Sequence, residues 1–138
     1  MDNETKKLLA KEVMGWEHLI VGYFGGLDET ARQVELEEWM EGVGISSVGE
    51  YFIDIENDWW VMVDEWSPDN NFSDAFRLLC GILGKPGFEC VDLRWMHGKW
   101  GVMEPFGNQM KVIRGSVDES LTKSICKGVL EIANRRNS

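Results

Sequence analysis

The spacing of apolar residues along this chain predicts helices separated by short strands. Apolar residues, aromatic ones included, recur at helical spacing over residues 4–14, 28–41, 73–84 and 118–134. Apolar stretches and period-two alternation predict strands over residues 16–24, 51–55, 59–66, 88–95, 99–106 and 109–113. This order favours an α+β fold, an α/β sandwich in which an antiparallel or mixed sheet packs with helices.

Local signals refine these helices. Asn3 and Ser73 are expected N-caps, because short polar side chains accept hydrogen bonds from the first free amides of a helix. The face that packs on the sheet is expected to contain Phe72, Phe76, Leu79 and Leu83 in the helix over 73–84.

Length and composition bound the class of protein. The chain has 138 residues, of which 43% are apolar, so we expect one globular domain over residues 1–138. No apolar run approaches the roughly 20 residues of a membrane-spanning helix. The N-terminal residues lack the basic and then apolar order of a signal peptide, which favours the cytoplasm of the producing cell.

The cysteines and histidines do not form a metal-binding pattern. Cys80, Cys90 and Cys126 are widely spaced, and the chain has only two histidines, His18 and His97. We therefore expect three buried free thiols and no metal ion or cofactor.

Charge is divided unevenly along the chain. The net charge is −10, with −13 in residues 1–84 and +3 in residues 85–138. Any anionic ligand is therefore expected in the second part. The acidic first part disfavours direct DNA binding and permits contact with a basic partner.

No catalytic motif accompanies this pattern. Gly25-Gly26 lacks the Gly-Lys-Ser/Thr continuation of a phosphate loop, and no Ser or Cys forms a nucleophile motif with His. A nuclease-like set of Asp69, Glu89 and Asp92 near Arg94 lacks the expected lysine two residues after the acid. We therefore expect a protein that is not an enzyme.

One segment combines cations with flat aromatic rings, over residues 94–100. Cationic donors neutralise phosphate and indoles stack on bases, so the segment is a candidate nucleotide site. The candidate ligand-binding residues are Arg94, Trp95, His97, Lys99, Trp100, Lys111 and Arg114. The alternative is a plain β-hairpin, in which the charged and indole side chains face opposite sides.

Three stretches resemble the phage ABA sandwich domain family: residues 9–16, with Lys11-Glu12-Val13-Met14-Gly15-Trp16; Trp66-Ser67-Pro68 followed by residues 72–76; and the closing helix around residues 124–130. The resemblance implies an α/β sandwich and a bacteriophage origin, and it brings no established activity. It covers most of the chain except roughly 25–50, which has the character of an insertion. We interpret the three motifs as determinants of the fold.

Two functions follow as hypotheses. The first is a viral anti-defence protein, a sponge in the cytoplasm of the infected bacterial host that sequesters a nucleotide-derived immune signal in a pocket completed by a second subunit. The second is an acidic inhibitor that docks through residues 28–65 on a basic host protein, imitating nucleic acid. Seven Trp and six Phe exceed what a core of this size comfortably hides, so a homo-oligomer is expected.

Overall fold

A computed structural model describes residues 1–21, 31–44, 48–83 and 90–136, without the side chains of 31–34, 37 and 136. The chain divides into two compact units. Unit 1 comprises Met1–Met14 and Ser67–Ser138, and unit 2 comprises Gly15–Trp66. That residues 1–138 form one domain stays a prediction, and the insertion expected over 25–50 lies partly outside the described residues.

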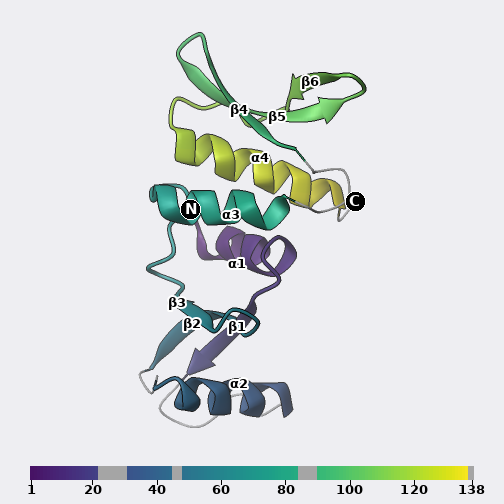
Figure 1. The fold of residues 1–138 in the computed structure, drawn as a ribbon. Helices are drawn as coiled ribbons and strands as arrows, with labels where there is room; N and C mark the ends of the chain where they lie inside the picture. Colours follow the sequence, from purple (N-terminus) through teal and green to yellow (C-terminus); the bar gives the residue numbers. More distant parts are fainter. Residues whose placement is uncertain (22–30, 45–47, 84–89, 137–138) are drawn as a thin grey trace. The chain divides into compact units, whose positions relative to one another are not determined.

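The α+β class is confirmed. The described residues form four helices and two three-stranded sheets, in which every pairing is antiparallel (Figure 1). Strand order is β1-β2-β3 in the sheet of unit 2 and β4-β5-β6 in the sheet of unit 1. Because both sheets are built from strands joined by tight turns or one helix, local pairing suffices to form each of them.

The helices of unit 1 are α1 (Asn3–Glu12), α3 (Phe72–Ile82) and α4 (Leu121–Arg136). The two expected caps are wrong. Asp2 caps α1 by accepting a 2.7 Å hydrogen bond from the Thr5 amide, and Asn71 caps α3 by accepting one of 3.0 Å from the Asp74 amide. In both cases the residue at the true boundary also has a short polar side chain, so the sequence signal was correct in kind and displaced by one or two positions.

Helix α3 buries a different face from the one predicted. Its buried residues are Ala75, Leu78, Leu79 and Ile82. Phe72 and Phe76 are 54% and 52% exposed and stack on each other, and Leu83 just beyond the helix is 40% exposed. The helix has apolar residues on two faces, and its packing against α4 selects the aliphatic one.

Helix α4 supports the sheet of β4 (Asp92–Met96), β5 (Lys99–Phe106) and β6 (Gln109–Val112). A Cβ on Gly128 would lie 2.9 Å from Val102 of β5, so only glycine permits this close approach. The helix begins at Leu121 and not at Asp118, because the backbone of Asp118 exchanges two hydrogen bonds with Trp100, of 2.7 and 3.0 Å.

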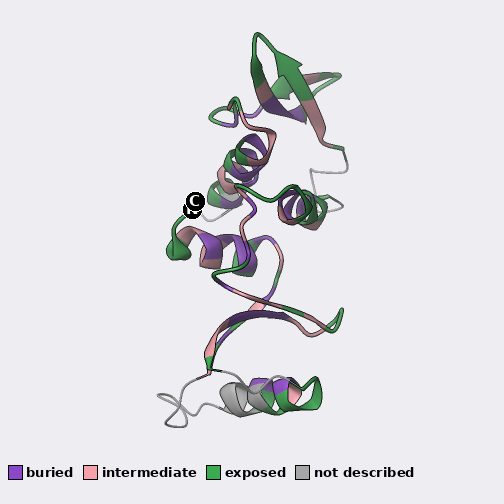
Figure 2. Cartoon of the chain, turned by 90° about the vertical axis from the view of Figure 1, so that its left-hand side faces the viewer, coloured by how far each residue is buried: buried purple, intermediate pink, exposed green. Residues whose placement is uncertain are grey.

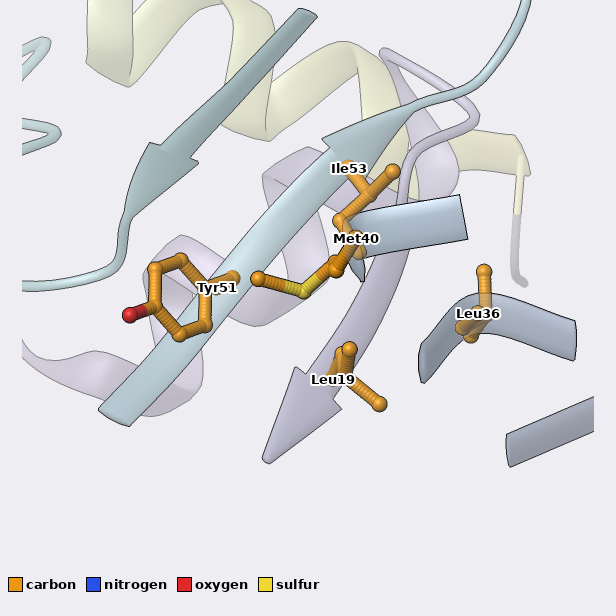
Figure 3. Close-up of a cluster of buried hydrophobic side chains, with 5 residues drawn as sticks. All are labelled: Leu19, Leu36, Met40, Tyr51 and Ile53. Atoms are coloured by element: carbon orange, nitrogen blue, oxygen red, sulfur yellow. The ribbon is translucent and has the colours of Figure 1, made fainter. Parts of the chain in front are cut away.

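Unit 2 contains β1 (Glu17–Val21), α2 (Ala31–Gly42), β2 (Gly49–Asp54) and β3 (Trp59–Met62). Strand register places Leu19 opposite Tyr51, so both lie on one face of the sheet. Figure 3 shows these residues in a buried cluster with Ile53 of β2 and with Leu36 and Met40 of α2. The strands contribute to this cluster because alternate residues face the same side, and α2 contributes because residues four apart lie on one face of a helix.

The other face of the same sheet is aromatic. Trp66, which is fully buried, lies 5.2 Å from Trp16 and 5.5 Å from Phe52 between ring centroids. Trp59 lies 4.8 Å from Trp16. Trp16 and Trp66 come from two of the sequence motifs, and their packing agrees with the interpretation of those motifs as determinants of the fold.

The cysteines were predicted to be buried, which is correct for one of them. Cys126 is buried in α4, and burial raises the pKa of its thiol to about 12. Cys80 and Cys90 are exposed. Cys80 lies on α3 beside the aliphatic face that packs inward, so an apolar neighbourhood in sequence did not imply burial.

Candidate functional site

The predicted nucleotide-binding segment forms a tight β-hairpin. Strands β4 and β5 pair with Trp95 opposite Trp100 and Met96 opposite Lys99, which leaves His97-Gly98 as a two-residue turn. His97 has φ 53° and Gly98 has φ 79°. Positive φ at both positions is typical of a type I′ turn, whose twist matches that of paired strands. His97 therefore has a structural role in the turn, and its imidazole is exposed.

Strand register divides the segment between the two faces of the sheet. Arg94 is opposite Gly101 and Lys99 is opposite Met96, which places both cations on one face. Trp95 and Trp100 share the other face, with ring centroids 5.4 Å apart in an edge-to-face arrangement. The arrangement is the one expected of a plain hairpin, and no single face combines Arg94 with an indole.

The two remaining predicted site residues are Lys111 and Arg114. Lys111 is opposite Glu104 and lies on the indole side, where its Nζ is 4.2 Å from the centroid of the Phe106 ring. Arg114 follows β6 and is exposed. Arg135 of α4 contacts both carboxylate oxygens of Glu104, at 3.0 and 2.8 Å.

The cations of this sheet differ in their partners. The Nε of Arg94 donates to Asp92 Oδ2 at 2.9 Å. Lys99, Lys111 and Arg114 form no ion pair with any residue in the described part of the chain. These three exposed cations are therefore the ones that remain available to an anion.

The nuclease-like set does not assemble among the residues the structure describes. Asp92 is paired with Arg94, and Glu89 lies outside the described ranges. Burial raises the pKa of the Asp69 carboxyl, but the 2.9 Å hydrogen bond from the N-terminal ammonium, a backbone hydrogen bond and the positive charges of that ammonium and Lys6 together lower it below its ordinary value. Over the described residues, no three His, Cys, Asp or Glu side chains come together as metal ligands.

A second candidate surface is the whole of unit 2. Its 52 residues contain thirteen Asp or Glu and one basic residue, Arg32, for a net charge of −12. Unit 1 contains thirteen Lys or Arg and eleven Asp or Glu, for a net charge of +2. Unit 2 carries −12 in 52 residues, whereas residues 1–84 carry −13 in 84 residues, so the negative charge is more concentrated in unit 2 than in the first part of the sequence.

Helix α2 places three of these carboxylates on one of its sides. Leu36 and Met40 face the sheet, while Glu35, Glu38 and Glu41 are exposed. With 3.6 residues per turn, these three positions lie on the side opposite Leu36 and Met40. Other exposed carboxylates of unit 2 are Glu56, Asp58, Asp64 and Glu65. The sequence analysis identified an acidic region over residues 28–65. Residues 15–66 contain no Lys, and this signal could have given the full extent of the acidic region.

Comparison with known protein families, curated proteins and solved structures finds no match to this chain. Membership in the phage ABA sandwich domain family therefore stays a prediction carried by the three sequence motifs. In the part of the chain that the structure describes, no helix is long and apolar enough to cross a membrane.

Proposed function

We propose that this chain is a non-enzymatic binding protein that docks through acidic unit 2 on a basic surface of another protein. The observation that carries the proposal is the concentration of −12 of net charge in one compact unit. A potential of this size steers a basic partner and disfavours nucleic acid and other anions. The resemblance to a phage family adds the expected setting, the cytoplasm of an infected bacterial host, where we propose that the protein acts against host defence.

The geometry of α2 indicates which basic surfaces fit. Three exposed glutamates at i, i+3 and i+6 are spaced about 4.5 Å apart along the helix axis, given a rise of 1.5 Å per residue. Phosphates follow one strand of DNA at about 3.4 Å of axis each. The spacing of negative charge is comparable, so the preferred partner is a host protein whose own surface binds nucleic acid.

The test compares two variants that have the same net charge. The first is the triple substitution Glu35→Gln, Glu38→Gln and Glu41→Gln, on α2. The control is Glu4→Gln, Glu12→Gln and Glu119→Gln, which removes three exposed carboxylates from unit 1. Proteins captured from a bacterial lysate are identified, purified and titrated by calorimetry at several salt concentrations.

The expected result is a basic nucleic-acid-binding protein whose affinity falls with salt. The α2 variant should bind it at least tenfold more weakly and with a shallower salt slope, while the control binds as the parent chain does. Equal weakening by the two variants would mean that net charge, and not the α2 surface, controls binding. Capture of neutral or acidic proteins alone would contradict the proposal.

A second candidate function is sequestration of a nucleotide-derived immune signal. The observation that favours it is the set of three exposed cations without an ion-pair partner among described residues, Lys99, Lys111 and Arg114, around one small sheet. Trp95 is 54% exposed on the face that also carries Lys111, and it offers a stacking face. The guanidinium of Arg94 is already paired with Asp92, so Arg94 can contact a nucleotide only while it shares its N–H groups with that carboxylate.

Calorimetry with a panel of cyclic and linear nucleotides tests sequestration. A charge-assisted hydrogen bond contributes about 1.5–3 kcal/mol, so Arg94→Ala or Arg114→Ala should weaken binding roughly tenfold to a hundredfold. Lys123→Ala, which removes an exposed cation of α4, is the matched control. If no nucleotide binds, or if the two arginine variants bind like the control, sequestration at this sheet is wrong.

A further inference from the structure

Strand β3 lies at one edge of the sheet of unit 2, with β2 between it and β1 (Figure 1). Just after β3, the amide of Val63 donates a 3.0 Å hydrogen bond to the carbonyl of Glu50. Because hydrogen-bonded and non-bonded pairs alternate along an antiparallel ladder, the backbone groups of Trp60 and Met62 point away from β2. Trp60 therefore directs both its N–H and its C=O to the outer edge of the sheet.

This outer edge of β3 has unused hydrogen-bonding groups. The carbonyl of Met62 already accepts hydrogen bonds from the amides of Glu65 and Trp66, at 3.0 and 3.1 Å. Among the residues that the structure describes, the N–H and C=O of Trp60 and the N–H of Met62 have no such backbone partner. Edge strands with groups of this kind accept a further strand from another chain, and the side chains beside them select which strand is accepted.

Side chains along β3 are more accessible than those of β2. Tyr51, Phe52 and Ile53 of β2 are buried, whereas no residue of β3 is buried. The turn that joins the two strands is exposed, as Figure 2 shows. Trp60 is 38% exposed, and its indole meets the ring of Tyr51 edge to face, with centroids 5.7 Å apart. This contact orients the indole and leaves part of it accessible.

Carboxylates lie at both ends of β3. Asp58 precedes the strand, and Asp64 and Glu65 follow it, all three exposed. None of the three forms an ion pair with a residue in the described ranges. An edge that has an exposed indole between unpaired carboxylates is complementary to a basic segment. Arginine fits this edge better than lysine, because a planar guanidinium stacks on an aromatic ring and still donates hydrogen bonds to carboxylates.

We propose that the outer edge of β3 binds an extended, arginine-containing segment of a basic partner as an additional strand, with one arginine stacked on Trp60. This inference rests on the proposed function, the docking of unit 2 on a basic protein, and names the part of that partner which is bound. The Cβ atoms of opposite residues in paired strands lie about 4.5–5.5 Å apart, so an arginine that faces Trp60 reaches its ring. Further arginines along the segment lie toward the carboxylates at the ends of β3.

Calorimetry with two blocked peptides of about eight residues tests the preference for arginine. One peptide alternates arginine with threonine and the other alternates lysine with threonine, so the two have the same charge. The parent chain should bind the arginine peptide about tenfold more tightly, and Trp60→Val should reduce this ratio to about one. Trp95→Val is the matched control, because it removes an exposed indole from the other sheet and should leave the ratio unchanged. Circular dichroism establishes that both variants are folded.

N-methylated peptides test strand addition on the parent chain itself. Two versions of the arginine peptide have methyl groups on alternate amides, one on the amides of the arginines and the other on those of the threonines. Only alternate amides of an added strand form hydrogen bonds with β3, so one version should lose at least tenfold in affinity and the other should bind as before. Equal affinities of the two versions would overturn strand addition.

The outcomes separate this inference from the proposed function. Equal binding of the arginine and lysine peptides, weakened by the substitutions at Glu35, Glu38 and Glu41 and not by Trp60→Val, would overturn the edge site and leave the docking of unit 2 intact. Failure of both peptides to bind, although unit 2 captures a basic protein, would also overturn the edge site, and the carboxylates beside β3 would then serve only to keep sheet edges apart. Failure of the peptides and of the capture experiment would overturn both proposals.

Discussion

Both sheets of this protein have three antiparallel strands, but the residues and helices that pack on them differ. In unit 2, one face packs on Leu36 and Met40 of α2, and the other carries the Trp16, Phe52 and Trp66 cluster. In unit 1, the sheet packs on α4 through one face, and its other face carries both the buried Met103 and the exposed Met96. Both units leave apolar side chains exposed, such as Ile20 and Trp60 in unit 2, but only unit 2 is strongly acidic. The two units therefore suit different kinds of partner.

The largest expected effect is in the aromatic cluster of unit 2. Trp66→Ala should cost about 3–5 kcal/mol of unfolding free energy, because it leaves a cavity beside Trp16 and Phe52. Hydrogen exchange measured by mass spectrometry should show the loss of protection in β2 and β3. Protection of α4 should be retained if the two units are separately stable.

Trp66→Phe is the control for that substitution. The Trp66 Nε1 is buried with no hydrogen-bond partner in the described structure, so phenylalanine keeps a ring and removes an unsatisfied donor. Its cost should be below about 1.5 kcal/mol. Equal loss of protection in α4 and in β2 would contradict separate stability and would support one cooperative domain over residues 1–138.

A smaller effect is expected where α4 meets β5 in unit 1. Gly128→Ala places a Cβ 2.9 Å from Val102, and overpacking of this kind costs about 1–3 kcal/mol. The higher helix propensity of alanine returns up to about 1 kcal/mol, so a net loss is expected in urea denaturation.

Gly42→Ala in α2 is the matched substitution in unit 2. A Cβ at Gly42 meets no described atom within 4 Å, so the gain in helix propensity should appear unopposed. If Gly128→Ala stabilised the protein as Gly42→Ala does, the close contact between α4 and β5 would be wrong.

The smallest effect is a pH dependence in unit 1. Hydrogen bonds from Lys127 Nζ at 2.7 Å and from the Ser120 amide at 2.8 Å lower the pKa of Asp118 below its ordinary value of 3.8. A lowered folded-state pKa contributes stability above pH 3.8, which is lost as the pH falls through the folded-state value. Asp118→Asn should therefore cost below about 1 kcal/mol at pH 7, given the partial exposure of the pair.

Thermal unfolding of the parent chain and Asp118→Asn at pH 7 and at pH 3 checks this sign. The difference in Tm should narrow at the lower pH, because the parent carboxyl is then increasingly protonated. A difference that stays constant with pH would mean that the carboxylate charge of Asp118 is not the cause of the loss, since the substitution leaves the backbone pairing with Trp100 in place.

Sequence reasoning succeeded where the signal was local and periodic. Strand β5 was predicted at Lys99–Phe106 and is observed there. The connection of this hairpin was predicted at residues 96–98, and the structure narrows it to His97-Gly98, both with positive φ. The choice between the two apolar faces of α3 failed, since both faces have helical period and only a packed neighbour distinguishes them.

The same distinction between local signals and tertiary contacts applies to the candidate site. The sequence by itself determined the α+β class, the residues of the hairpin and the acidic character of residues 28–65, because composition and periodicity are properties of the chain. Only the tertiary structure decided that Arg94 and Trp95 lie on opposite faces and that Arg94 is paired with Asp92. It also decided that the charge follows the units and that Phe72 and Phe76 are exposed. Burial and pairing depend on neighbours distant in sequence, which a local pattern does not specify.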